Sequence, residues 1–381
     1  MSPGKRSPLN ILVVDDSAVV REVMTAVLAQ EPGFSVTVAG DPFIAMGKMK
    51  QKRPDVIVLD LEMPRMDGLT FLRKIVREDF IPVVICSALT GPDTRIGLQA
   101  LEEGAVDVVT KQRLGVRDFL HESAVVLIDA VRAAARCAGR KPIAPPLAAT
   151  PRLKDGAMLA GKSAMPLSIT SDKVVAVGAS TGGTEALKSI LEAMPPDAPG
   201  LVVVQHMPEG FTAAFAQRLN QSCRIEVKEA ANGDRVAAGR ALIAPGNLHI
   251  LVRRNGGQYS VEVADGPLVS RHRPSVDVLF RSVAQSAGAN AVGVIMTGMG
   301  NDGAEGLLEM QQAGAFTLAQ DESSCVVFGM PKEAIERGAV DRVVNLAGIP
   351  AAILSGRTTD KGQLSGRRYA PHAREKEQPE P

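Results

Sequence analysis

Residues 11–16 read ILVVDD, four apolar residues followed by two aspartates. Further short runs rich in Val and Ile occupy residues 35–39, 56–59, 83–86 and 106–109, and helical patterns such as residues 18–29 and 43–50 lie between them. Apolar runs of this length are typical of strands that are covered on both faces of a parallel sheet. Five such strands alternating with helices predict a five-stranded, doubly wound α/β domain over residues 9–137.

Polar side chains follow four of these predicted strands at the point where each strand ends. Asp15 and Asp16 follow the first, Asp60 the third, Ser87 the fourth and Lys111 the fifth. Because the carboxyl ends of parallel strands meet at one edge of a sheet, we expect these groups to share a pocket. Clustered carboxylates repel one another unless a cation is present, and Mg²⁺ prefers oxygen ligands and bridges to phosphate. A single aspartate in such a place is usually a turn or cap residue, but the whole set predicts a phosphoryl-transfer site.

Residues 9–130 resemble the receiver domain of response regulators. The resemblance rests on DD at 15–16, LDLEMPRMDG at 59–68, CSALTG at 86–91 and VTK at 109–111. It implies that Asp60 accepts a phosphoryl group from a histidine kinase. The other implied roles are Mg²⁺ ligation by Asp16, Asp60 and the backbone carbonyl of Glu62, a partly water-mediated role for Asp15, and phosphoryl contacts from Ser87 and Lys111.

Two positions depart from the receiver pattern. Receivers usually carry proline after the lysine, where this chain has Gln112, and an aromatic residue three positions before it, where this chain has Val108. In the family the aromatic residue takes part in a rotamer switch that follows phosphorylation. The departures leave the chemistry at Asp60 intact and leave open how the signal is passed on.

A second α/β domain is predicted over residues 171–355. Apolar runs at residues 174–177, 201–204 and 291–295 precede helical stretches, and shorter strand patterns occupy 241–244, 249–253 and 259–263. We expect a second doubly wound sheet with an antiparallel hairpin or edge. Residues 138–170 are basic and rich in proline, which predicts a linker, and the polar residues from 356 onward predict a disordered tail.

Three strand ends of the second domain carry a possible catalytic triad. Ser180 lies in GASTGG at 178–183, His206 follows LVVVQ, and Asp302 lies in the glycine-rich loop GMGNDG at 298–303. A serine hydroxyl needs a base, and the base needs an orienting acid. The residues therefore predict a nucleophile, a base and its acidic partner.

Other interpretations of these motifs are weaker. The pattern G-x-S-x-G is by itself a poor signal, and the order Ser, His, Asp differs from that of α/β-hydrolases. A dinucleotide-binding loop would need an acidic residue after the second strand, where this chain has Gln205 and His206. His272, Ser275 and Asp277 are too close in sequence to converge as a triad. We expect Ser275 to cap a helix, His272 to lie at the surface or the substrate rim, and His249 to belong to a sheet.

Residues 173–350 resemble the methylesterase domain of the chemotaxis response-regulator protein-glutamate methylesterases. Matching stretches are GASTGG at 178–183, VVVQHMP at 202–208, APGNLHI at 244–250, DGP at 265–267, RHRPSVDVLF at 271–280 and TGMGNDGAEGL at 297–307. The resemblance implies Ser180 as nucleophile, His206 as base and Asp302 as its partner. It also implies that Thr181 lines the site, that the Met299 backbone amide belongs to the oxyanion hole, and that the esterase site uses no cofactor.

The two resemblances together imply a phosphorylation-activated enzyme. Its substrates would be glutamate γ-methyl esters on the helical cytoplasmic region of methylated chemoreceptors, with methanol released through an acyl-enzyme, and receptor glutamine would be deamidated in the same way. A tethered receiver could dock over Ser180 and leave when Asp60 is phosphorylated. We expect a cytoplasmic monomer.

Composition excludes several other classes of protein. The 381 residues include 43 Lys and Arg against 42 Asp and Glu, so bulk charge does not hold this chain to DNA or to an anionic membrane. Aromatic residues make up only 3%, and the four cysteines form no C-x-x-C pair, which argues against single-strand stacking, zinc and disulfides. No apolar run is long enough to span a membrane. A phosphorylation-dependent binding module that has lost activity and a small-ester hydrolase remain as alternatives. A DNA-binding regulator is disfavoured, and no DNA partner is expected, because the second domain shows no recognition-helix motif.

Overall fold

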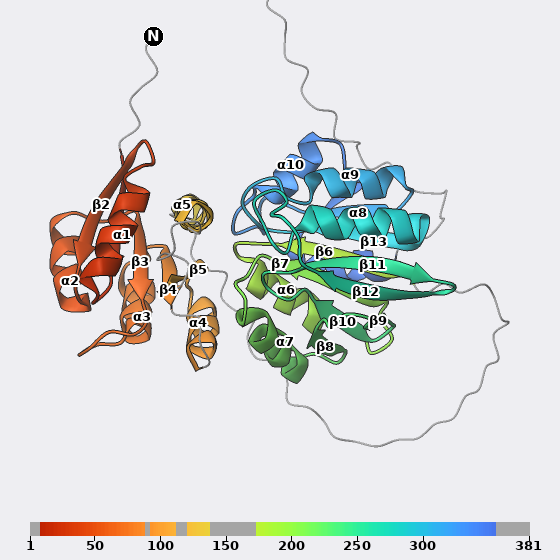
Figure 1. The fold of residues 1–381 in the computed structure, drawn as a ribbon, viewed down its shortest axis with the longest axis horizontal. Helices are drawn as coiled ribbons and strands as arrows, with labels where there is room; N and C mark the ends of the chain where they lie inside the picture. Colours follow the sequence, from red (N-terminus) through yellow and green to blue (C-terminus); the bar gives the residue numbers. More distant parts are fainter. Residues whose placement is uncertain (1–7, 88–91, 112–119, 138–172, 356–381) are drawn as a thin grey trace, which may run out of the picture.

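The computed structural model describes residues 8–87, 92–111, 120–137 and 173–355. Two α/β units lie side by side (Figure 1). The predicted linker and tail lie outside the described residues, as do Gln112, His372 and the side chain of His121.

The first unit is built on a parallel sheet with the strand order β2-β1-β3-β4-β5. All five predicted strands are present, and their ends differ from the predicted ones by at most two residues. The elements are β1 (Leu9–Val14), α1 (Ala18–Leu28), β2 (Phe34–Ala39), α2 (Pro42–Gln51), β3 (Val56–Asp60), α3 (Gly68–Glu78), β4 (Val83–Ser87), α4 (Pro92–Glu102), β5 (Asp107–Thr110) and α5 (Leu120–Arg136).

Capping residues set where the first helices begin. Ser17, Asp41 and Asp67 each accept a hydrogen bond from a backbone amide three residues further on, at 3.4, 2.9 and 2.8 Å. These side chains satisfy amides that the first helical turn leaves free. The strand-to-helix turns therefore form the carboxyl edge of the sheet, where Asp15 and Asp60 lie.

The second unit contains a seven-stranded parallel sheet with the order β15-β14-β13-β6-β7-β10-β8. Its central strands were predicted from their apolar runs, and the doubly wound α/β fold is confirmed. The elements are β6 (Val174–Ala179), α6 (Gly183–Glu192), β7 (Gly200–Gln205), α7 (Phe211–Ser222), β8 (Glu226–Glu229), β10 (Arg240–Ile243), α8 (Val276–Ala287), β13 (Ala291–Ile295), α9 (Ala304–Gln312), β14 (Phe316–Gln320), α10 (Met330–Glu336), β15 (Arg342–Val344) and α11 (Ile349–Ser355).

The predicted antiparallel hairpin belongs to a separate sheet. Strands β11 (His249–Asn255) and β12 (Gln258–Ala264) pair antiparallel, and the two-residue strand β9 (Arg235–Val236) pairs with β12. Helices α8, α9 and α10 cover one face of the large sheet, and α6, α7 and α11 contribute to the core on the other (Figure 1). No helix in the described residues is long and apolar enough to cross a membrane.

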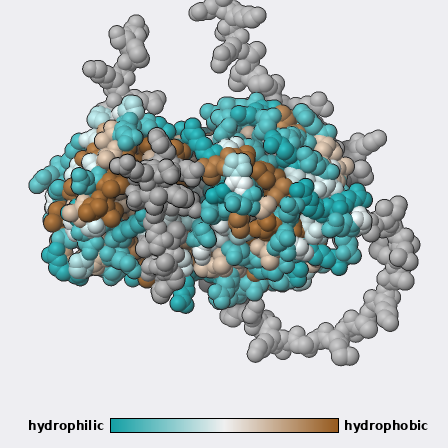
Figure 2. Space-filling model, in the orientation of Figure 1, coloured by the Kyte–Doolittle hydropathy of each residue, from teal (hydrophilic) through white to brown (hydrophobic). Residues whose placement is uncertain are grey.

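The two units touch through α4, α5 and β5 of the first. Helix α4 packs on α7, where the ring of Phe211 lies against Gly97, and Glu102 forms an ion pair with Arg218. On the other side of the contact, Cys137 Sγ lies 3.9 Å from the carbonyl oxygen of Val326. The surface visible in the same view is mostly hydrophilic, with apolar side chains gathered in a few patches (Figure 2).

Candidate functional site

The first unit carries the predicted acidic pocket. Oxygen atoms of Asp15, Asp16 and Asp60 all lie within 4.8 Å of one another. Lys111 Nζ lies 2.9 Å from Asp15 Oδ2 and 2.6 Å from Asp60 Oδ2, and Ser87 is buried at the end of the adjacent strand β4. A set of close carboxylate oxygens is the donor set that a hard divalent cation prefers, so the residues fit Mg²⁺.

Burial makes the charge on Asp60 costly. Burial raises the pKa of the Asp60 carboxyl; the Lys111 ion pair opposes that rise, and the neighbouring Asp15 adds to it. The backbone amide of Glu62 donates to Asp60 Oδ1 at 3.2 Å, so the chain after β3 folds back over this carboxylate. A cation in the pocket would offset the repulsion between the aspartates. The role of the Glu62 carbonyl stays a prediction.

Strand register brings Ser180 and His206 together in the second unit. Ala179 on β6 pairs with Gln205 on the neighbouring strand β7, so the two residues that follow are next to each other at the sheet edge. The His206 amide also donates to the Ala179 carbonyl at 3.1 Å. Asp302 enters from the loop after β13, the other neighbour of β6, and His206 Nε2 lies 2.8 Å from Asp302 Oδ2.

Two glycines let the backbone reach this arrangement. Gly182 has φ 78°, a left-handed conformation, where the chain turns from Ser180 into α6. A Cβ at Gly298 would lie 2.7 Å from Ser180 Cβ, so only glycine lets the Asp302 loop approach Ser180 this closely. The glycines of both motifs are therefore structural requirements of the site.

Asp302 is built to remain ionised. Besides His206, it accepts hydrogen bonds from Ser275 Oγ at 2.7 Å and from the amides of Val276 and Asp277 at 2.8 and 3.0 Å, at the start of α8. Although burial opposes ionisation, the His206 bond and these donors lower the pKa of Asp302 to about 2. An ionised Asp302 holds a proton on Nε2 of His206, which leaves Nδ1 as the acceptor. Nδ1 is buried and has no hydrogen-bond partner within the described part of the chain.

Comparisons with known proteins bear on both units. A family model described as CheB methylesterase matches residues 175–353, and one described as response regulator receiver domain matches residues 11–119. A protein-glutamate methylesterase/protein-glutamine glutaminase of Anaeromyxobacter dehalogenans is 60% identical over 354 residues, which cover 92% of this chain and 98% of the relative. A protein of Geobacter metallireducens with the same description is 57% identical over 349 residues, 91% of this chain and 98% of the relative. The chain belongs to the protein-glutamate methylesterase/protein-glutamine glutaminase family. Among solved structures, the Thermotoga maritima CheB methylesterase catalytic domain is 38% identical and covers 48% of this chain and 97% of its own, with a TM-score of 0.47.

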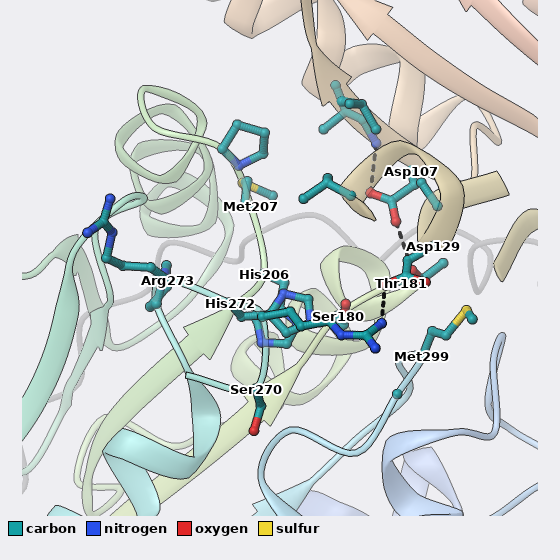
Figure 3. Close-up of a pocket in the computed structure, with 18 of the residues that line it drawn as sticks. Asp107, Asp129, Ser180, Thr181, His206, Met207, Ser270, His272, Arg273 and Met299 are labelled. Carbon is teal, nitrogen blue, oxygen red and sulfur yellow. Dashed lines mark hydrogen bonds and ion pairs between the residues drawn. The ribbon is translucent and has the colours of Figure 1, made fainter. Parts of the chain in front are cut away.

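The segment RHRPSVD contributes more to the methylesterase site than sequence reasoning allowed. The His272 ring stacks on the His206 ring, with centroids 3.7 Å apart and planes 9° from parallel (Figure 3). Of the surface or substrate-rim position expected for His272, the structure shows the rim, since His272 is half-buried in the pocket wall. Burial, with His206 as the next cause, lowers the pKa of His272 to about 3, so this ring is neutral at pH 7.

Ser275 and His249 take the positions predicted for them. Ser275 caps α8 through a hydrogen bond from the Val278 amide at 3.4 Å, and buried His249 begins β11. Sequence reasoning missed that the same Ser275 hydroxyl donates to Asp302. The signal for this was available, because a helix N-terminus at the strand-end rim attracts a carboxylate.

The pocket that holds Ser180 and His206 lies at the contact between the two units. A cavity of about 550 Å³ is lined by Ser180, Thr181, His206 and Met299 from the second unit and by residues of β5 and α5 from the first. Thr181 Oγ1 donates to Asp107 Oδ2 at 2.7 Å (Figure 3). Burial raises the pKa of the Asp107 carboxyl, and the Thr181 bond opposes the rise. The proposed oxyanion role of the Met299 amide stays a prediction.

Proposed function

We propose that this chain hydrolyses glutamate γ-methyl esters on methylated chemoreceptors when its receiver is phosphorylated, and that it deamidates receptor glutamine at the same site. The observation that carries the proposal is the hydrogen bond between His206 and the ionised Asp302, beside Ser180 at adjacent strand ends. Membership of a family whose relatives carry this activity in their names supports the same conclusion.

The residues would perform the reaction in two halves. Ser180 Oγ attacks the ester carbonyl while His206 Nδ1 takes its proton, and Asp302 stabilises the imidazolium that forms. His206 returns the proton to the methoxy oxygen, so methanol leaves and a glutamyl-serine ester remains. His206 then takes a proton from water, which attacks the acyl-enzyme, and returns it to Ser180 Oγ as glutamate leaves. With glutamine as substrate, ammonia leaves in the first half.

Two further groups of the second unit would assist this chemistry. The Met299 backbone amide would donate to the oxyanion, and the Thr181 hydroxyl borders the same space. The esterase step draws on side chains and backbone amides, with no cofactor in its proposed mechanism.

Regulation would begin at Asp60 of the receiver. Its carboxylate would attack the phosphoryl group delivered by a chemotaxis histidine kinase, and Lys111 and Ser87 would contact the transferred phosphoryl oxygens. Asp16, Asp60 and the Glu62 carbonyl would hold Mg²⁺, with Asp15 partly through water. When bound, the ion neutralises charge on the phosphoryl oxygens. Phosphorylation would weaken the contact between the receiver and the catalytic pocket and open the site.

Methanol release from methylated receptor membranes tests the proposal. Wild type and Ser180→Ala are each assayed with and without a small-molecule phosphodonor and Mg²⁺. We expect release that requires Ser180 and rises with phosphodonor. Release that ignores phosphodonor would refute the regulation, and no release would point to a different ester or to a binding module.

A further inference from the structure

The receiver places two carboxylates in the wall of the catalytic pocket. Asp107, at the start of β5, accepts the hydrogen bond from Thr181, the residue after the proposed nucleophile. Asp129 on α5 has its Oδ2 atom 3.7 Å from a guanidinium nitrogen of Arg271. Both acids line the cavity that holds Ser180 (Figure 3).

The carboxylate of Asp107 belongs to the same chemical class as the reaction product. Hydrolysis of a glutamyl ester leaves a carboxylate next to the serine that released it, and the Thr181 hydroxyl borders this place. Asp107 offers Thr181 the same chemical group from the receiver side. Its other oxygen accepts from the Val108 amide at 2.8 Å, which fixes the direction of the carboxylate.

Arg271 lies at the tip of an unusual turn. Val269 and His272 exchange backbone hydrogen bonds of 3.1 and 2.9 Å, and the two residues between them, Ser270 and Arg271, have φ of 50° and 69°. Positive φ at both central positions defines a type of tight turn that usually carries Asn-Gly. Residues that keep such conformations without glycine gather at functional sites.

The contact between Arg271 and the receiver is too weak to explain why the chain tolerates the strained backbone of this turn. It is 68% exposed, and its ion pair with Asp129 is long. Arg273, two residues on, is different: its guanidinium contacts Asn247, Asp265 and the Gly266 carbonyl, so it holds the loop together. Among the described residues, Arg271 forms an ion pair with Asp129 of the receiver alone, so the catalytic unit itself leaves this cation at the pocket rim unpaired.

We propose that Thr181 and Arg271 form a recognition subsite for acidic side chains of the substrate, and that Asp107 and Asp129 occupy this subsite while the receiver is docked. The inference rests on the proposed function. Thr181 would contact the reacting γ-carboxyl group, and Arg271 would bind a carboxylate one helical turn away, since residues three or four apart share one helix face. Receiver and substrate would then compete for the same groups.

Two helical peptides test the substrate side. Each carries one glutamyl methyl ester; the acidic peptide has Glu four residues before and after it, and the neutral peptide has Ala at both places. With phosphodonor present, we expect wild type to prefer the acidic peptide by about tenfold in kcat/KM, a preference that salt weakens. Arg271→Ala should reduce the ratio to near one. Arg253→Ala is the matched control, because Arg253 is also exposed and ion-paired but lies on β11, away from the cavity.

The outcomes separate this inference from the proposed function. If neither peptide yields methanol with wild type, the proposed function fails. If wild type hydrolyses both equally, or if Arg271→Ala keeps the full preference, the esterase stands and the subsite is refuted.

A charge swap tests the receiver side. Without phosphodonor, Asp129→Asn should raise methanol release by up to about fivefold, as expected for an exposed ion pair, whereas Asp79→Asn, which removes an exposed receiver carboxylate paired with Arg53, should not. Asp129 also pairs with Arg132 at 3.6 Å, so the double variant Asp129→Arg with Arg271→Asp is compared with Asp129→Arg alone, in which the repulsion from Arg132 is the same. The double variant should lower release relative to that single variant, since the ion pair is reversed, yet it should not restore the preference for the acidic peptide. Release that stays high in the double variant would refute occupation of the subsite by Asp129.

Discussion

A methyl group added at Gly97 should activate the enzyme without phosphorylation. Gly97 lies on α4 of the receiver and faces the ring of Phe211, the first residue of α7, which is fully buried. A Cβ on Gly97 would lie 2.6 Å from Cε1 and 3.1 Å from Cζ of that ring. Carbon atoms in contact stay about 3.5–4.0 Å apart, so Gly97→Ala requires a separation of about 1 Å.

The cost of this clash should fall on the docked state. Overpacking by one methyl group typically costs about 1–3 kcal/mol, whereas Gly→Ala inside a helix favours that helix by about 0.5–1 kcal/mol. The receiver should therefore fold at least as well as before, while the contact between α4 and α7 weakens. A coupling energy of about 1–3 kcal/mol corresponds to a shift of about 5–150-fold toward the undocked state.

The assay is methanol release without phosphodonor, with thermal unfolding of each variant as a check on folding. Gly97→Ala should approach the activity that wild type reaches with phosphodonor. Gly47→Ala is the control, since Gly47 lies in α2 and an added Cβ meets nothing within 4 Å. Unchanged activity of a folded Gly97→Ala variant would refute the idea that the α4–α7 contact holds the site closed.

Four further predictions concern the catalytic unit. Asp302→Asn should lower kcat by about 10⁴-fold with little change in KM, measured by methanol release, because an amide cannot hold the His206 tautomer as the carboxylate does. The pKa of Asp302 is about 2 when folded and near 3.8 when unfolded, so its contribution of about 2 kcal/mol is complete above pH 4 and should be lost in acid unfolding curves as the pH falls through 2. His272→Ala should lower kcat by up to about 100-fold because the His206 ring loses its stacking partner, whereas His272→Phe should keep most of the activity and the same pH–rate profile. Arg271→Gly should stabilise the strained turn by about 0.5–1 kcal/mol in thermal unfolding while it removes the preference for acidic peptides.

The sequence predicts best those strands and site residues that a single local pattern is sufficient to locate. Buried parallel strands read as apolar runs, so the central strands and the polar residues at their ends could be located. Four strands of the second unit were not predicted: β8, β9, β14 and β15. Strand β9 has only two residues, and β8 and β15 are short edge strands with few buried residues. Strand β14 (FTLAQ) is largely buried, but Thr317 and Gln320 interrupt its apolar residues, so it does not read as an apolar run.

The features of the site that the sequence did not predict are contacts between residues that only the tertiary structure brings together. His272 lies in a loop without strand or helix periodicity, and only the fold brings its ring onto His206. The hydrogen bond between Asp107 and Thr181 joins residues 74 positions apart in two separate units. No local pattern encodes how one folded unit docks on another, so the inner wall of the pocket could not be predicted.

The short strand β5 links the two sites directly. Asp107 at its start contacts Thr181 of the catalytic unit, and Lys111, directly after its end, pairs with Asp60, the proposed phosphoacceptor. At about 3.3 Å per residue, roughly 13 Å of extended chain separates these two contacts. Val108 between them is buried under α4 and lacks the aromatic ring that receivers usually carry there, so a ring rotamer cannot carry the signal at this position. A shift of Lys111 toward a phosphoryl group would pull on the same strand that holds Asp107 in the pocket. Strand movement is therefore the shortest physical route from phosphorylation to release of the active site.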